Sequence, residues 1–162
     1  MPAKKISYKL KLEIEKLLEI YKSNRFLEAI NLARSVIRKR PTERLPLKVL
    51  AASLAQANKL DEALIVNEKL ILLDPQDPEA HINLGIIFNE LGNHGDAEIC
   101  FRNAKNLYPN SYNVFYNLGY TQRKLQRLNE AVASFKRSIE LKNDYPQAHC
   151  NLASTLLELR RF

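Results

Sequence analysis

The sequence has little of what enzyme active sites and metal centres are commonly built from. Its 162 residues include two cysteines, three histidines, four glycines and no tryptophan. Cys100 and Cys150 lie far apart and carry no metal-ligand spacing, so we predict neither a disulfide framework nor a zinc site and interpret both as packing residues. There is no glycine-rich phosphate loop, and the histidines form no ligand set. We therefore predict no catalytic residue, no cofactor, no metal and no enzymatic activity within these residues.

Long apolar runs are also absent. No run reaches the roughly 18 apolar residues that indicate a transmembrane helix. The first 18 residues mix lysine and glutamate among their apolar residues, which does not fit the uninterrupted apolar core of a secretory signal. Together these features favour a cytoplasmic location.

The net charge of +7 is concentrated at one end of the chain. Residues 1–44 hold 12 lysines and arginines against 5 acidic residues, and the remaining residues are balanced. A basic cluster between residues 34 and 44 would attract phosphates, but it has no interleaved aromatic residues and no base-reading motif. A solvated face, a membrane-surface contact or an interdomain contact explains it better than nucleic-acid binding. The cluster consists of Arg34, Arg38, Lys39, Arg40 and Arg44.

What the chain does contain is a repeated unit, clearest in residues 78–111. Two apolar faces with i, i+3, i+4 spacing predict two helices, and residues 92–95 form the turn between them. A period of 34 residues carries the pattern along the chain. Four positions of the period recur: leucine at 50, 84, 118 and 152; a small residue at 51, 85, 119 and 153; alanine at 29, 63, 97 and 131; proline at 41, 75 and 109.

This pattern resembles that of the tetratricopeptide repeat (TPR) family, W-x2-L-G-x2-Y, then A-x3-F, then P. The resemblance implies an all-α TPR solenoid, a right-handed superhelix of four helix-turn-helix repeats plus one terminal helix, in a single array. The predicted boundaries are a basic lead-in at 1–9, repeats at 10–43, 44–77, 78–111 and 112–145, and a terminal helix at 146–162.

Three local expectations accompany these boundaries. In the first repeat, apolar residues at 14, 17, 18 and 21 run one residue behind the period, so we predict that the turn at 23–25 is one residue short. Asp61 is placed to cap the second helix of the second repeat. The terminal helix is interpreted as the first helix of a truncated fifth repeat, and its apolar end at 156–162 as a possible self-assembly surface.

In TPR proteins the first helix of each repeat lines a concave groove, so the resemblance predicts where a ligand would bind. Asparagine stands at the sixth position of three successive repeats. An amide is both donor and acceptor, so a row of them suits the main chain of an extended peptide. In HINLG and HCNLA this ladder resembles the arrays of O-linked N-acetylglucosamine transferases. The predicted peptide- or partner-binding residues are Asn83, Asn117, Asn151, Ile82, Ile86, Tyr116 and Tyr120.

Each of these residues also has a structural interpretation. Asparagine is common at this repeat position, and tyrosines four residues apart can simply cover a neighbouring helix. Some TPR domains bind the acidic C-terminus of heat-shock chaperones with a clamp of lysine, asparagine and arginine side chains, and two mismatches argue against such a clamp here. Lys48 is followed by Ala52 where the clamp has asparagine, and Asn113 and Asn117 stand where it has lysine and arginine. The sequence thus predicts a protein-interaction scaffold for an extended peptide or partner segment. The alternative is the recruiting region of a larger glycosyl or sulfuryl transferase whose catalytic domain is absent here.

Overall fold

The computed structural model describes residues 2–160, with side chains from residue 8 onward. Within this range the chain forms nine α-helices and no strand, as the repeat pattern predicted. It divides into two compact units, Met1–Pro75 and Gln76–Phe162. None of the helices in the described range combines the length and the apolarity that crossing a bilayer requires.

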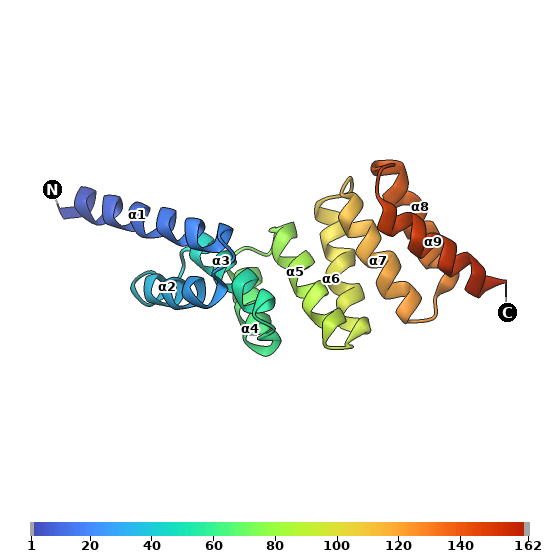
Figure 1. Cartoon of the computed structure of the whole chain (residues 1–162), viewed down its shortest axis with the longest axis horizontal. Helices are drawn as coiled ribbons and strands as arrows, with labels where there is room; N and C mark the ends of the chain where they lie inside the picture. Colours follow the sequence, from blue (N-terminus) through green and yellow to red (C-terminus); the bar gives the residue numbers. More distant parts are fainter. Residues whose placement is uncertain (1, 161–162) are drawn as a thin grey trace. The chain divides into compact units, whose positions relative to one another are not determined.

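Unit 1 contains four helices (Figure 1): α1 (Pro2–Lys22), α2 (Phe26–Lys39), α3 (Arg44–Gln56) and α4 (Leu60–Leu73). Helix α3 packs against both α2 and α4, and α1 packs against α2 and α3. The described residues of the predicted lead-in at 1–9 are part of the first helix, because α1 begins at Pro2 and runs for 21 residues. Proline is tolerated in the first turn of a helix, where its missing N–H has no partner to lose.

Unit 2 contains five helices: α5 (Pro78–Glu90), α6 (His94–Leu107), α7 (Tyr112–Lys124), α8 (Leu128–Leu141) and α9 (Pro146–Leu159). The pairs α5/α6 and α7/α8 pack most extensively, and α7 also contacts α5 and α9 (Figure 1). At the start of α5, Asp77 Oδ1 accepts a hydrogen bond of 3.1 Å from the Glu79 N–H, which caps one of the free donors at the helix end. The first helices of three successive repeats therefore lie side by side, with α7 between α5 and α9.

The helical hairpins turn at equivalent positions throughout the chain. A residue with positive φ occupies the turn at Asn24, Asn58, Gly92 and Gln126, with φ of 58°, 56°, 80° and 60°. This spacing is the same in the first hairpin as in the others, so its turn is not one residue short as predicted. In keeping with the unshifted register, Leu17 and Ile20 are the buried apolar residues of this part of α1.

Two further local predictions need correction or completion. Helix α4 begins at Leu60 with Lys59 as its N-cap, so Asp61 does not cap it. Asp61 lies in the first turn, where a carboxylate still interacts favourably with the helix dipole. At the end of the chain Leu156 and Leu157 are exposed, whereas residues 161 and 162 of the predicted self-assembly surface lie outside the described residues. Self-assembly stays a prediction.

The core of unit 2 depends on close contact between glycine and phenylalanine. Gly85 of α5 faces the ring of Phe101, and Gly119 of α7 faces the ring of Phe135. A Cβ atom at either glycine would lie 2.8 to 2.9 Å from ring carbons, closer than carbon atoms approach in proteins. Glycine is thus required at these positions because each helix backbone rests directly on an aromatic ring.

Candidate functional site

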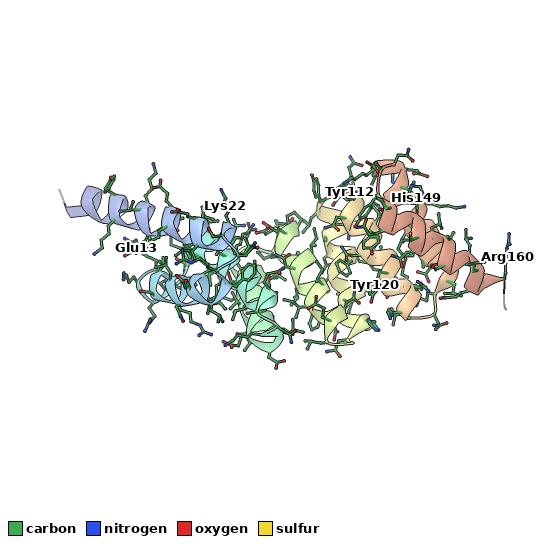
Figure 2. All side chains as sticks on the ribbon, in the orientation of Figure 1. Glu13, Lys22, Tyr112, Tyr120, His149 and Arg160 are labelled. Atoms are coloured by element: carbon green, nitrogen blue, oxygen red, sulfur yellow. The ribbon has the colours of Figure 1, made fainter. Side chains whose placement is uncertain are left out.

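The predicted binding residues lie on the three neighbouring helices of unit 2. Helix α5 carries three of them, α7 carries three and α9 carries one; all are partly buried. Figure 2 labels Tyr112 and Tyr120, both on α7. The set, in chain order, is Ile82, Asn83, Ile86, Tyr116, Asn117, Tyr120 and Asn151.

Four of these residues line one concave feature between α5 and α7. The cavity has a volume of about 230 Å³ and is referred to below as the α5–α7 hollow. Ile82, Asn83 and Asn151 are not among the residues that line it. Asn89 and Glu90, which sequence reasoning did not select, line it as well. They occupy the twelfth and thirteenth repeat positions, which face the groove in this family, so their positions in the repeat could have identified them. The lining residues are Ile86, Asn89, Glu90, Tyr116, Asn117 and Tyr120.

The two isoleucines serve the core as well as the surface. Ile82 and Ile86 pack against a buried cluster of Ala97, Phe101 and Leu118, and each remains partly exposed. The packing gives these side chains a structural role, and their predicted role in binding stays a prediction. They hold α5 in place and also present apolar surface along the groove.

The amides of the asparagine ladder are not equally available to a ligand. Asn117 Nδ2 donates to the Asn113 carbonyl oxygen at 2.8 Å and to Asn113 Oδ1 at 3.1 Å. The Asn117 Oδ1 atom is left as an acceptor without a partner among the described residues. Since a carbonyl one turn earlier fixes the amide orientation, Asn117 offers an acceptor rather than both functions.

Asn151 is fully engaged within the protein. Its Nδ2 donates to the Gln147 carbonyl at 3.0 Å and to the Tyr116 hydroxyl at 3.2 Å. Its Oδ1 accepts from Arg123 Nη1 at 3.3 Å. Asn151 therefore has no free donor or acceptor for the main chain of a peptide, and its place among the binding residues stays a prediction. Asn151 instead fixes the hydroxyl of Tyr116, one wall of the α5–α7 hollow.

A hydrogen-bond network joins α5 to α7 beneath the hollow. Asn89 Nδ2 donates to Thr121 Oγ1 at 2.8 Å, and that hydroxyl donates to the Asn117 carbonyl at 2.7 Å. Asn89 Oδ1 lies 3.0 Å from His94 Nδ1. Thr121 is fully buried, so these bonds satisfy polar groups that would otherwise cost stability. They also hold Asn89 in a fixed orientation at the hollow.

Aromatic contacts fix the Tyr116 wall. The Tyr116 ring centroid lies 5.0 Å from that of Tyr145 and 6.0 Å from that of Phe135. Tyr112 also stacks edge-on against Tyr145 at 5.1 Å. Burial among these rings raises the pKa of the Tyr145 hydroxyl. Because such tilted and T-shaped pairs are favourable geometries, Tyr116 enters the groove as a rigid side chain.

An ion pair links α7 to α9. Arg123 Nε lies 3.1 and 3.2 Å from the two carboxylate oxygens of Glu158, and this hydrogen bonding raises the pKa of the arginine. Both side chains are about one-third exposed, and the fork geometry is the strong, bidentate arrangement of this pair. The two charges neutralise one another, so neither is presented singly to a ligand.

The basic cluster of unit 1 is largely paired with acidic residues. Arg34 bonds Glu62, Lys39 Nζ lies 3.0 Å from Glu13, and Arg44 Nη1 lies 2.7 Å from Asp74. A cation that is already paired offers less to a phosphate backbone. The prediction that the cluster is not a nucleic-acid site stays a prediction.

The two cysteines have different environments. Cys100 is buried, and burial, with a smaller contribution from Asp96, raises the pKa of its thiol to about 11. Cys150 is exposed, so its interpretation as a packing residue is wrong. Within the part of the chain that the structure describes, no group of three or more histidine, cysteine or acidic residues is arranged to hold a metal.

Two family models match the chain. One, described as TPR repeat, covers residues 122–159, and the other, described as Tetratricopeptide repeat, covers residues 49–112. The chain belongs to the tetratricopeptide repeat family. The likeness of its asparagines to the O-linked N-acetylglucosamine transferase arrays stays a prediction.

Solved TPR structures are similar to this TPR chain over most of its length. MamA from Desulfovibrio magneticus RS-1 matches with a TM-score of 0.88 at 17% identity, over 94% of this chain and 86% of that one. The first TPR of Spaghetti (RPAP3), bound to the HSP90 peptide SRMEEVD, matches with a TM-score of 0.71 at 25% identity, over 72% and 93%. The MamA likeness establishes the fold alone.

Curated relatives are much longer than this TPR chain. Drosophila melanogaster Protein O-mannosyl-transferase Tmtc3 is 33% identical over 124 residues, which are 67% of this chain and 13% of that protein. The Peroxisomal targeting signal receptor of Saccharomyces cerevisiae is 28% identical over 86 residues, 53% of this chain and 14% of that protein. The chain thus spans about one-seventh of the length of these relatives.

Proposed function

We propose that unit 2 of this TPR chain is a non-enzymatic interaction module that binds an extended peptide segment of a partner protein in the groove along α5, α7 and α9. The observation that carries the proposal is the α5–α7 hollow, because four of the seven residues selected from sequence line it. Support comes from the similar RPAP3 repeat domain, whose structure holds an HSP90 peptide.

In this proposal each side chain of the groove makes a different kind of contact with the peptide. Asn117 Oδ1 accepts a backbone N–H of the peptide, since its own amide N–H groups are engaged by Asn113. Ile82 and Ile86 provide apolar contact, and Tyr116 and Tyr120 provide rigid aromatic surface of the kind that dominates binding energy at interfaces. Asn151 acts indirectly by orienting Tyr116.

The test is selection of nine-residue peptides from a random display library on the full chain, followed by affinity measurements with synthetic peptides. Asn117→Ala is expected to weaken binding about five- to tenfold, the value of one hydrogen bond. Tyr120→Ala is expected to weaken it at least as much.

The matched control is Asn103→Ala, an exposed asparagine on α6, which should leave affinity unchanged. Helical circular dichroism of each variant separates loss of binding from loss of fold. Affinities that are unchanged in both groove variants would refute the proposed site.

The alternative, a recruiting region within a larger transferase, has less support. The identity with Tmtc3 covers 13% of that protein, and a shared repeat region does not transfer the activity of a whole protein. The cytoplasmic location stays a prediction.

A further inference from the structure

Both amide nitrogens at the α5–α7 hollow already donate within the protein, and several acceptors remain available. The Nδ2 groups of Asn117 and Asn89 donate to Asn113 and Thr121. The Asn117 Oδ1, the Glu90 carboxylate and the Tyr120 hydroxyl oxygen have no hydrogen-bond or ion-pair partner in the described residues. The Tyr116 and Tyr120 hydroxyl groups can still donate, so the Glu90 carboxylate, which only accepts, is the group that favours a donor-bearing ligand.

Charge and ring surface point to the same class of ligand. Glu90 is exposed at the hollow and carries the one formal charge among the six lining residues. The rings of Tyr116 and Tyr120 form the aromatic part of the lining. Aromatic faces attract cations within about 6 Å. A carboxylate beside aromatic faces is the electrostatic complement of an ammonium or guanidinium group.

The size of the hollow fits a side chain better than a free small molecule. Its volume of about 230 Å³ is below the roughly 300 Å³ at which small-molecule sites begin. One long side chain with an apolar stem would fill this space. Ile86 and the tyrosine rings would contact the stem.

We infer that the α5–α7 hollow is a subsite for a lysine or arginine side chain of the bound segment. This inference rests on the proposed peptide-binding function and names the chemistry of the partner. It separates this chain from TPR domains that hold acidic peptide tails, because an acidic side chain here would face Glu90 and find the amide N–H groups of Asn117 already engaged.

Lys124 is a cation near the hollow that opposes such a ligand. Its Nζ lies 5.5 Å from the Tyr120 ring centroid, although it is not among the residues that line the hollow. Removing this charge should favour a cationic ligand. Lys124→Ala is therefore expected to tighten the binding of a lysine-bearing peptide by about two- to fivefold.

The experiment uses the nine-residue display library and the full chain. Enriched peptides are expected to share a lysine or arginine at one position. Replacing that residue with norleucine, which keeps the aliphatic stem and removes the charge, should weaken binding to the wild type about tenfold. Glu90→Gln should reduce that difference to about twofold, as a double-mutant cycle requires of directly interacting groups.

The matched control for charge removal is Glu68→Gln, an exposed glutamate on α4, which should leave the tenfold difference intact. If peptides bind in a manner sensitive to Asn117→Ala but show no preference for a basic residue, the basic subsite is wrong and the proposed function stands. If no peptide is enriched, or if binding ignores Asn117 and Tyr120, the proposed function and the subsite both fail.

Discussion

Gly119 offers the sharpest test of how unit 2 is packed. It lies in the middle of α7, and a Cβ atom there would sit 2.9 Å from both Cδ1 and Cε1 of Phe135. Phe135 is fully buried, so it cannot move toward solvent to make room. Overpacking of this kind costs about 1–3 kcal/mol, whereas alanine gains about 1 kcal/mol over glycine in a helix interior. The expected result for Gly119→Ala is a net loss of about 1 kcal/mol.

Gly95 provides the matched control. It lies within α6, and a Cβ atom built there meets nothing within 4 Å. Gly95→Ala therefore retains only the gain in helix propensity, up to about 1 kcal/mol. The two glycine-to-alanine changes should move stability in opposite directions. Urea unfolding followed by circular dichroism at 222 nm measures both on the same scale, as a shift of the transition midpoint at unchanged slope.

A second substitution identifies the cause of the loss. Phe135→Leu removes the ring atoms that the new methyl group meets, so Gly119→Ala should be neutral or stabilising in that background. The reasoning would be refuted if Gly119→Ala were as stable as Gly95→Ala, or if its cost were unchanged beside Leu at position 135. Since Tyr116 rests on Phe135 at 6.0 Å, Gly119→Ala should also weaken peptide binding in the α5–α7 hollow.

Three further predictions concern buried polar groups. Asn67 is 1% exposed and its Oδ1 has no hydrogen-bond partner in the described residues. Asn67→Leu should therefore raise the free energy of unfolding by about 1 kcal/mol or more. The control Asn31→Leu, at an exposed site on α2, should give no gain beyond helix propensity. The Glu98 side chain is 6% exposed and accepts from Arg102 at 2.9 Å and from Arg127 at 2.8 Å. Glu98→Gln should lower the free energy of unfolding by about 1–3 kcal/mol. Equal stability would argue against the Glu98–Arg127 pair as a link between α6 and the α7–α8 turn. The pKa of Cys100 is raised from 9.0 to about 11, so the folded state favours the neutral thiol. The resulting contribution to stability is complete below pH 9 and is lost as the pH rises to about 11. The free energy of unfolding should therefore fall less over that range in Cys100→Ala than in the wild type.

Much of the fold was predictable because it depends on short-range, periodic patterns. Apolar residues at i, i+3 and i+4 predicted the helices, and the period placed their turns. The first repeat was misread because the strict period puts Lys16 where the later repeats have leucine, and Leu17 where they have alanine or glycine. Shifting the register by one residue brought Leu17 to the leucine position and Leu18 to the next one. In the structure the register is unshifted and the large residue is simply accommodated.

The chemistry of the groove was harder to predict, because it depends on which hydrogen bonds the protein makes with itself. The sequence identified Asn117 and Asn151 correctly as members of neighbouring helices. It could not show that each would donate to the carbonyl four residues earlier, or that Arg123 would approach Asn151. These contacts involve side-chain rotamers, which a repeat pattern does not encode. Glu90, by contrast, stands at a repeat position that faces the groove in this family, so the sequence could have selected it as a residue of the hollow.

The aligned core positions explain why the groove of unit 2 differs from the first helices of unit 1. At two equivalent places the four repeats carry Leu17 with Ala33, Ala51 with Asn67, Gly85 with Phe101, and Gly119 with Phe135. A large residue in the first helix accompanies a small one in the second, and the order reverses along the chain. In unit 2 the phenylalanine rings reach the backbone of the first helices, and Tyr116 packs on the ring of Phe135. A rigid aromatic wall on the groove therefore follows from having glycine within α7, and unit 1, with leucine or alanine in place of that glycine, has no phenylalanine at the facing position to support one.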